Sequence, residues 1–179
     1  MNGCQKRHNR LLHFEPAASE SRPDVQSNAT VTVHRQSATS TLFRMVPVTL
    51  YSETGQVNTY AFLDDGSSVT LVEQAIVNAL GVQGKTESLC IQWTGGINKQ
   101  FSDAQRVKLF ISGACSSKQF SVSNAYTVAN LGLPEQSLNF DDMTKQYEHL
   151  RGLPITSFQR ASPGILIGLS NTHLLATLK

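Results

Sequence analysis

The stretch Tyr60–Leu71, "YAFLDDGSSVTL", places an apolar run directly against two acids, a glycine and two serines. Asp-Gly is a common pair in surface turns, and a turn is the simpler interpretation of Asp65-Gly66. A catalytic carboxylate accounts for more of the stretch. It needs an acid at the end of a strand, a glycine that lets backbone approach closely, and hydroxyl groups beside it. We expect Asp64 to be that acid.

The composition is that of a globular protein with nearly balanced charge. Hydrophobic residues make up 40% of the 179 residues and charged residues 16%, which argues against a wholly disordered chain. A formal net charge of +2 gives no electrostatic reason to expect a nucleic-acid partner. The sequence contains no apolar run of about 18 residues and no signal-peptide core, so we expect an intracellular, cytoplasmic protein without a membrane partner.

Two segments differ in composition. Residues 16–41 are rich in Ser, Thr, Ala, Asn and Gln, and they carry too few apolar side chains to offset the entropy of ordering, so they are interpreted as a disordered linker. Residues 42–179 are interpreted as the folded domain. The three cysteines, Cys4, Cys90 and Cys115, are expected to be free thiols, and the last two are predicted as small buried residues on strands.

Strand patterns dominate the folded domain. A hairpin is predicted from residues 43–52 and 57–64, with Pro47 limiting the first strand to an edge or a strand start. Apolar residues at helical spacing from Leu71 to Leu80 predict a helix that stops at Gly81. Further strands are expected on both sides of Gly95-Gly96 and at 118–128 and 165–167, with short helices near 141–150 and after Gly168.

A single carboxylate motif has a consequence for assembly. Two adjacent carboxyl groups can share one proton, so that one acts as a general base for water and the other as a general acid for a peptide carbonyl. Asp141-Asp142, the other acidic pair, is followed by Met143 and Thr144 rather than by glycine. The second acid must therefore come from another copy of the chain, which predicts a homodimer with a two-fold axis.

The stretch "FLDDGSS" resembles the apolar-apolar-Asp-Thr/Ser-Gly-Ala/Ser motif of retropepsin-like aspartic proteases. "ILIGLSN" is similar to their apolar strand that ends in glycine before a terminal helix, and "WTGG" lies where they carry a glycine-tipped flap. The resemblance is closest to the peptidase domain of BEL/Pao LTR-retrotransposon polyproteins. That domain shows the same order of "VPVTLY", "LDDGSS", "WTGG", "LP", "HLRGLP" and "ILIGL", over Leu42 to Leu175 here.

The resemblance implies an all-β, retropepsin-like acid-protease barrel, closed or partly open, with a flap hairpin and one or two short helices. It implies a homodimeric aspartic endopeptidase that cleaves extended peptides, such as its parent polyprotein, without a cofactor or metal. Ser67 would hydrogen-bond the catalytic carboxylate. The residues it assigns are Asp64 as catalytic acid, Asp65, Gly66, Ser67 and Ser68 in the active-site loop, Trp93, Thr94, Gly95 and Gly96 in the flap, and Ile167 and Gly168 as loop support.

Three departures keep a second interpretation open. Asp65 stands where many retropepsins carry Thr or Ser, and an ionised Asp cannot donate their hydrogen bond across the dimer axis. Ser170 stands where an Asp is expected, and Leu131–Pro163 is additional sequence without an assigned role. The alternative is a catalytically decayed, retroelement-derived module for dimerisation or peptide binding. Trp93 is compatible with substrate contact and with a place in the core.

The first 15 residues raise a separate question of metal binding. Cys4, His8 and His13 are possible zinc ligands, and related polyproteins carry zinc-knuckle segments ahead of the protease, so residues 1–15 are interpreted as a remnant of such a segment. A closed zinc site needs four ligands, so no metal is expected to bind. A nucleic-acid-binding remnant is the second rival function, and the small net charge argues against it.

Overall fold

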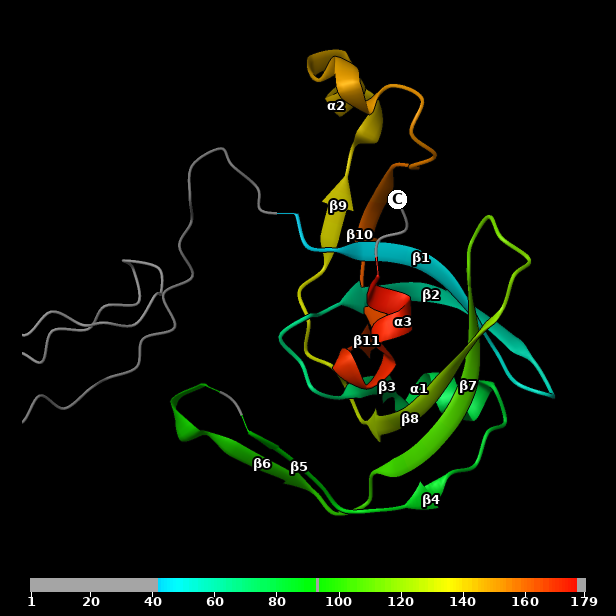
Figure 1. Ribbon diagram of the computed structural model, residues 1–179, viewed down its shortest axis with the longest axis vertical. Helices are drawn as coiled ribbons and strands as arrows, with labels where there is room; N and C mark the ends of the chain where they lie inside the picture. Colours follow the sequence, from blue (N-terminus) through cyan, green and yellow to red (C-terminus); the bar gives the residue numbers. More distant parts are fainter. Residues whose placement is uncertain (1–41, 93, 177–179) are drawn as a thin grey trace, which may run out of the picture. The chain divides into compact units, whose positions relative to one another are not determined.

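Six strands close into a barrel in the computed structural model, which describes residues 42–92 and 94–176 (Figure 1). β7 pairs with both β8 and β1, and this pairing closes the sheet. The barrel confirms the all-β fold class. In order around it, the strands are β1 (Met45–Tyr51), β2 (Gln56–Leu63), β11 (Pro163–Ile167), β3 (Thr70–Glu73), β8 (Phe120–Val128) and β7 (Gln105–Gly113), and β4 (Lys85–Thr86) is added to the side of β7.

The core fills the barrel with side chains that alternate along its strands. On β7 the residues Val107, Leu109 and Ile111 are buried, while Lys108 and Phe110 between them are exposed. This period of two is what a sheet with one solvated face requires. Removing these side chains from water is the main stabilising contribution to the barrel.

β11 lies between β2 and β3 in the barrel. It runs parallel to β2 and antiparallel to β3, and all five of its residues are buried. A strand covered on both faces is expected to be a continuous apolar run, as Ile165–Ile167 is. The prediction that Pro47 limits the first strand to an edge or a strand start is wrong, because β1 pairs with β2 on one side and with β7 on the other, and Pro47 is its third residue. The proline is tolerated because the register of β1 with β7 begins only at Val48.

The predicted helix from Leu71 begins later than expected. Residues Thr70–Glu73 form β3, and the helix α1 covers only Gln74–Ala79. Val72 pairs with β11 on one side and β8 on the other, so burial in the sheet outweighs the helical spacing of its neighbours. The predicted stop is confirmed, since Gly81 has a φ of +65°, which favours glycine.

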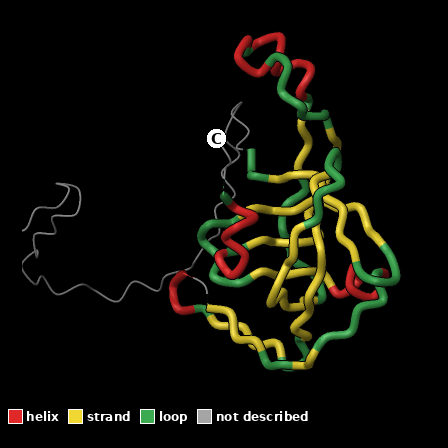
Figure 2. Tube along the Cα trace, turned by 45° about the vertical axis from the view of Figure 1, so that its right-hand side comes forward, coloured by secondary structure: helices red, strands yellow, loops and turns green. Residues whose placement is uncertain are grey.

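A separate two-stranded hairpin, β5 (Leu89–Gln92) and β6 (Asn98–Phe101), extends from the barrel (Figures 1 and 2). This flap hairpin confirms the two strands predicted on either side of Gly95-Gly96. Both glycines have positive φ, +82° and +77°, so the turn uses conformations that other residues rarely adopt. Trp93 and the predicted segments 1–15 and 16–41 lie outside the described residues.

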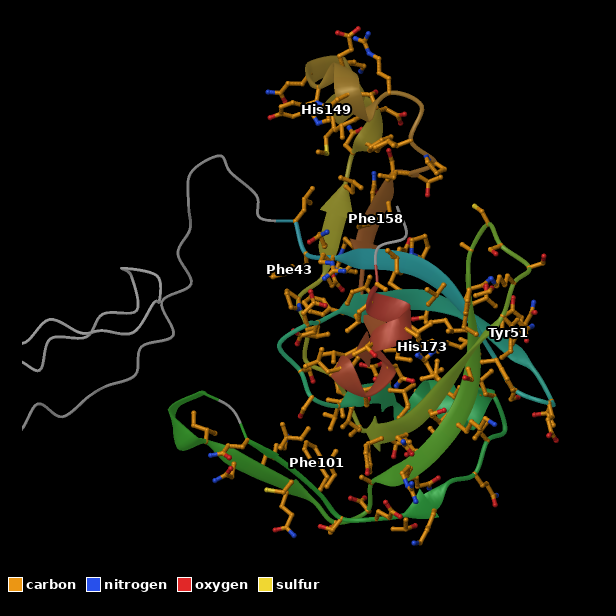
Figure 3. The ribbon with its side chains drawn as sticks, in the orientation of Figure 1. Phe43, Tyr51, Phe101, His149, Phe158 and His173 are labelled. Carbon is orange, nitrogen blue, oxygen red and sulfur yellow. The ribbon has the colours of Figure 1, made fainter. Side chains whose placement is uncertain are left out.

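A second projection, here called the arm, is built from the additional sequence Leu131–Pro163. It contains β9 (Gln136–Leu138), β10 (Phe158–Ala161) and α2 (Phe140–Gln146), which is the short helix expected near 141–150. The arm and the flap hairpin leave the barrel toward opposite ends of the view in Figures 1 and 2. At its base, the rings of Phe158 and Tyr60 lie 5.3 Å apart, and Phe158 is labelled in Figure 3.

Two smaller findings complete the comparison with the sequence. Cys90 and Cys115 are both exposed, so the prediction that they are buried is wrong: Cys90 lies on the thin flap hairpin, and Cys115 in the turn after β7. The short helix α3 (Thr172–Leu175) follows Gly168 as expected. None of the helices within residues 42–92 and 94–176 has the length and apolar character needed to cross a bilayer.

Candidate active site

Asp64 lies immediately after β2, where the chain leaves the barrel. Its backbone N–H donates to the carbonyl oxygen of Ile167 at 3.0 Å, which extends the β2–β11 pairing by one residue. Its side chain is half-buried, and the Oδ1 atom accepts a hydrogen bond of 2.9 Å from the N–H of Gly66. The acid is therefore fixed by backbone on one side and by its own loop on the other.

Gly168 lies directly behind this loop. A Cβ atom there would collide with the carbonyl oxygens of Ser67 and Val69, so only glycine permits the observed approach. The next residue, Leu169, donates its N–H to the Ser67 carbonyl at 2.8 Å. Ile167, 2% exposed, anchors the support in the core. These contacts match the supporting role predicted for Ile167 and Gly168.

A buried polar network that the sequence did not reveal connects the loop support to β8. Asn171, 1% exposed, bonds the Thr70 hydroxyl and both backbone groups of Ser123 at 2.8 to 2.9 Å. The Ser170 hydroxyl lies 3.0 Å from that of Thr70. Buried polar groups are stable when their hydrogen bonds are satisfied, and here they are. Ser170, a departure from the expected Asp, is thus part of the network.

The two serines of the loop have different surroundings. The Ser67 hydroxyl donates to the Val69 carbonyl at 2.8 Å, so it shapes the turn rather than binding the carboxylate as predicted. The hydrogen bond to Asp64 comes from the Gly66 N–H instead. Ser68 is exposed and faces the adjacent cleft.

A cleft of about 460 Å³ lies between the Asp64 loop and the first strand of the flap hairpin. It brings together two parts of the sequence that were predicted to act together, the Asp64 loop and the flap. Within the described residues, however, the flap contributes β5 to the lining and not the turn at Gly95-Gly96. The lining residues are Asp64, Gly66, Ser67, Ser68, Val69, Leu71, Cys90, Ile91, Gln92 and Leu166.

Asp65 is not among these lining residues and forms an ion pair within its own chain. Its Oδ2 atom accepts a hydrogen bond of 2.6 Å from Nη1 of Arg44, just before β1. The second guanidinium nitrogen, Nη2, lies 3.4 Å from the carbonyl oxygen of Leu175, the last residue of α3. Arg44 had no motif or spacing that marked it in the sequence.

The base of the flap hairpin is held by a second charged cluster. The Glu87 carboxylate accepts from Lys85 at 3.2 Å and from Arg106 at 3.0 Å, and Arg106 also reaches the Asn124 side chain. The hydrogen bond from the Lys85 ammonium, followed by that from Arg106, holds the pKa of Glu87 below its ordinary value of 4.5. Among the described residues, no group of His, Cys, Asp and Glu side chains could hold a metal ion.

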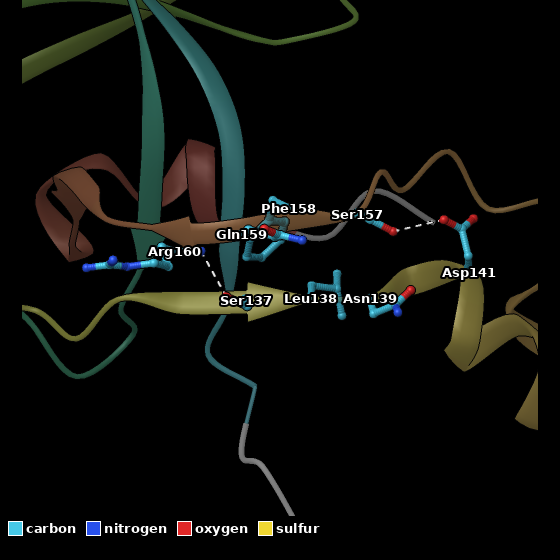
Figure 4. A pocket seen from close by; sticks show the side chains of 8 residues that line it. All are labelled: Ser137, Leu138, Asn139, Asp141, Ser157, Phe158, Gln159 and Arg160. Atoms are coloured by element: carbon cyan, nitrogen blue, oxygen red, sulfur yellow. Dashed lines mark hydrogen bonds between the residues drawn. The ribbon is translucent and has the colours of Figure 1, made fainter.

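The arm contains a larger hollow, of about 630 Å³, shown in Figure 4. Its charged side chains already have partners: Arg160 bonds Glu135 at 2.9 Å, and Asp141 accepts from Ser157 at 3.2 Å. No acid in it has the strand end and glycine loop that surround Asp64. We therefore take the smaller cleft as the candidate active site.

The lining of the cleft contains one carboxylate per chain, that of Asp64. Apolar residues such as Leu71 and Leu166 lie beside it, and β5 of the flap hairpin forms the other side. One carboxylate can accept a proton from water, but a second acid is needed to protonate a carbonyl or a leaving amine at the same time. A search of protein-family models found no match to this chain, and a search of curated proteins found none either.

Proposed function

We propose that the chain is a retropepsin-like aspartic endopeptidase that acts as a homodimer on extended peptides. The observation that carries the proposal is the position of Asp64. This acid ends a barrel strand, has a glycine loop braced from behind by Gly168, and opens onto a cleft beneath the flap hairpin. A surface turn would need none of these supports.

The mechanism follows from placing two such acids together. When the Asp64 carboxyl groups of two copies meet, like charges at that distance do not both ionise, so the pair holds one proton. The ionised member removes a proton from a water molecule, which then attacks the peptide carbonyl. The protonated member donates to the carbonyl oxygen, and the leaving amine is protonated in turn. The pair titrates as one unit.

The surface beside the loop supports an association through this end of the barrel. Leu169 is 48% exposed, although its N–H is bonded to the catalytic loop at Ser67. A dimer formed at Asp64 would cover this side chain, and its removal from water would contribute to association. The substrate class we propose is an extended segment of a polyprotein, held in the cleft between loop and hairpin.

Asp64→Asn is the decisive test. The amide keeps the shape of the side chain but cannot act as the base or share the proton, so cleavage of a polyprotein-derived peptide at mildly acidic pH should be lost. Asp142→Asn, on the exposed start of α2, is the matched control and should cleave normally. Pepstatin, an aspartic protease inhibitor, should block the wild-type activity. Undiminished cleavage by Asp64→Asn would rule out the mechanism.

Dilution tests the dimer. If the dyad spans two chains, activity per chain should fall on dilution together with the dimer fraction measured by sedimentation. A protein that stays monomeric and keeps its specific activity would contradict the two-chain site.

The alternative function is a non-catalytic dimerisation or peptide-binding module. One observation favours it: Asp65 accepts a hydrogen bond from Arg44 as a carboxylate, and a carboxylate has no O–H to donate to a partner loop. That alternative predicts a dimer that binds the peptide but cleaves it no faster than Asp64→Asn does.

A further inference from the structure

Arg44 holds the chain on both sides of Asp64. Its carbonyl oxygen accepts the N–H of Leu63 at 2.9 Å, and its guanidinium donates to the Asp65 carboxylate at 2.6 Å. Leu63 and Asp65 are the two neighbours of the proposed catalytic acid. One residue from the segment before β1 therefore fixes both ends of the tripeptide that carries it.

The guanidinium also reaches a third segment. Nη2 lies 3.4 Å from the Leu175 carbonyl at the end of α3, where a positive charge is favourable because the last carbonyls of a helix lack partners. Arg presents several N–H donors in a fixed planar fork, so one side chain can bind two acceptors at once. The catalytic loop, β1 and the terminal helix are thus joined through Arg44.

We propose that Arg44 is a positioning residue for Asp64, and that its ion pair with Asp65 organises the catalytic loop within one chain. The inference rests on the proposed function. In retropepsins that carry Thr or Ser at the position of Asp65, a hydroxyl bond across the dimer axis has this role. Here an ionised Asp65 cannot donate such a bond, and the acceptor it offers is taken by Arg44.

Charge balance gives a second reason for the pairing. In a dimer formed at Asp64, the adjacent Asp65 side chains would add two further negative charges near the axis. Carboxylates brought close together repel one another. One guanidinium per chain, 2.6 Å from Asp65, offsets that repulsion.

The pair is too exposed to matter greatly for folding. The Arg44 and Asp65 side chains are 46% and 63% exposed, and ion pairs of this kind contribute little to the free energy of unfolding. Loss of the pair should therefore alter the geometry of the loop while the barrel stays folded. A variant that loses activity but keeps its free energy of unfolding would therefore indicate a positioning role for Arg44 rather than a general structural one.

The test is a double-mutant cycle with Arg44→Gln, Asp65→Asn and the combined variant. Each single change should lower kcat about ten-fold or more with little effect on KM, because small displacements of a catalytic group are costly. The combined variant should be no worse than the poorer single one. Arg160→Gln, from the exposed 2.9 Å pair with Glu135 in the arm, is the matched control and should keep the wild-type kcat.

Amide hydrogen exchange gives a reading that needs no activity. The N–H groups of Asp64 and Gly66 should exchange faster in Arg44→Gln than in the wild type, and Arg160→Gln should leave them unchanged. Additive losses in the cycle, or unchanged kcat and exchange in Arg44→Gln, would overturn the inference. If the wild type shows no Asp64-dependent cleavage, the proposed function fails, while exchange at the loop still decides whether Arg44 holds it.

Discussion

The strand behind the Asp64 loop and the flap hairpin in front of it are built in opposite ways. β11 pairs on both sides, with β2 and β3, and every one of its residues is buried. In the part of the chain that the structure describes, β5 and β6 pair with each other alone, and Ile97 near the turn is 65% exposed. The proposed acid is therefore held against β11, a buried strand that is paired on both sides. It lies under the flap hairpin, whose strands have far fewer contacts.

The largest difference should come from one isoleucine in each region. Ile167→Ala removes a side chain that is 2% exposed and should cost about 2–5 kcal/mol of unfolding free energy, because a cavity remains. Ile97→Ala, in the flap, should change it by no more than about 0.5 kcal/mol. Urea denaturation of both variants checks this. Equal losses would mean that the flap is packed as tightly as the support.

Glycines give a smaller and different contrast. Gly168→Ala should cost about 1–3 kcal/mol, because the new methyl group forces the loop carbonyls to move. Gly95→Ala should cost about 1–2 kcal/mol through its φ of +82° alone, since no described atom lies near the added methyl. Cleavage assays separate the two, because the first change also displaces Asp64. Gly113→Ala, in open space at the end of β7, is the control.

The smallest effect concerns pH at the base of the flap. A lowered pKa means that the Glu87 contacts contribute stability above pH 4.5, and that this contribution is lost as the pH falls through the lower pKa of the folded state. Exchange of the Glu87 N–H, which donates to Ala104 at 2.8 Å, should accelerate in that range. Glu87→Gln should remove the pH step. A step that persists in this variant would assign it to another group.

Local chemistry made much of the fold predictable. The β1–β2 hairpin and the strands on either side of Gly95-Gly96 follow from alternating apolar residues and a glycine turn, and both were found where expected. The short helix expected near 141–150 is α2 (Phe140–Gln146). Leu71–Glu73 was predicted as the start of a helix and belongs to strand β3, because its partners β8 and β11 come from distant sequence. The spacing of apolar residues within one segment does not show which distant strands that segment will pair with.

In the candidate site, too, local features were predictable from the sequence and long-range contacts were not. The Asp64 loop and its support at Gly168 were visible as motifs, since an acid followed by glycine and an apolar strand ending in glycine are local patterns. Arg44, Thr70 and Asn171 were not predicted from the sequence. Each of them bonds a residue that is distant in the sequence, and no local pattern indicates such a contact. Cys90 was expected in a core, but a two-stranded hairpin has no second layer to cover it.

The position of β11 between β2 and β3 sets the order in which the barrel can be completed during synthesis. β2 and β3 are made about a hundred residues before the strand that joins them, so the sheet has a gap until Pro163–Ile167 leaves the ribosome. Contacts over such distances along the chain form slowly. The Asp64 N–H donates to the carbonyl oxygen of Ile167, so the backbone at Asp64 cannot be fixed in this way before nearly all of the domain has been translated.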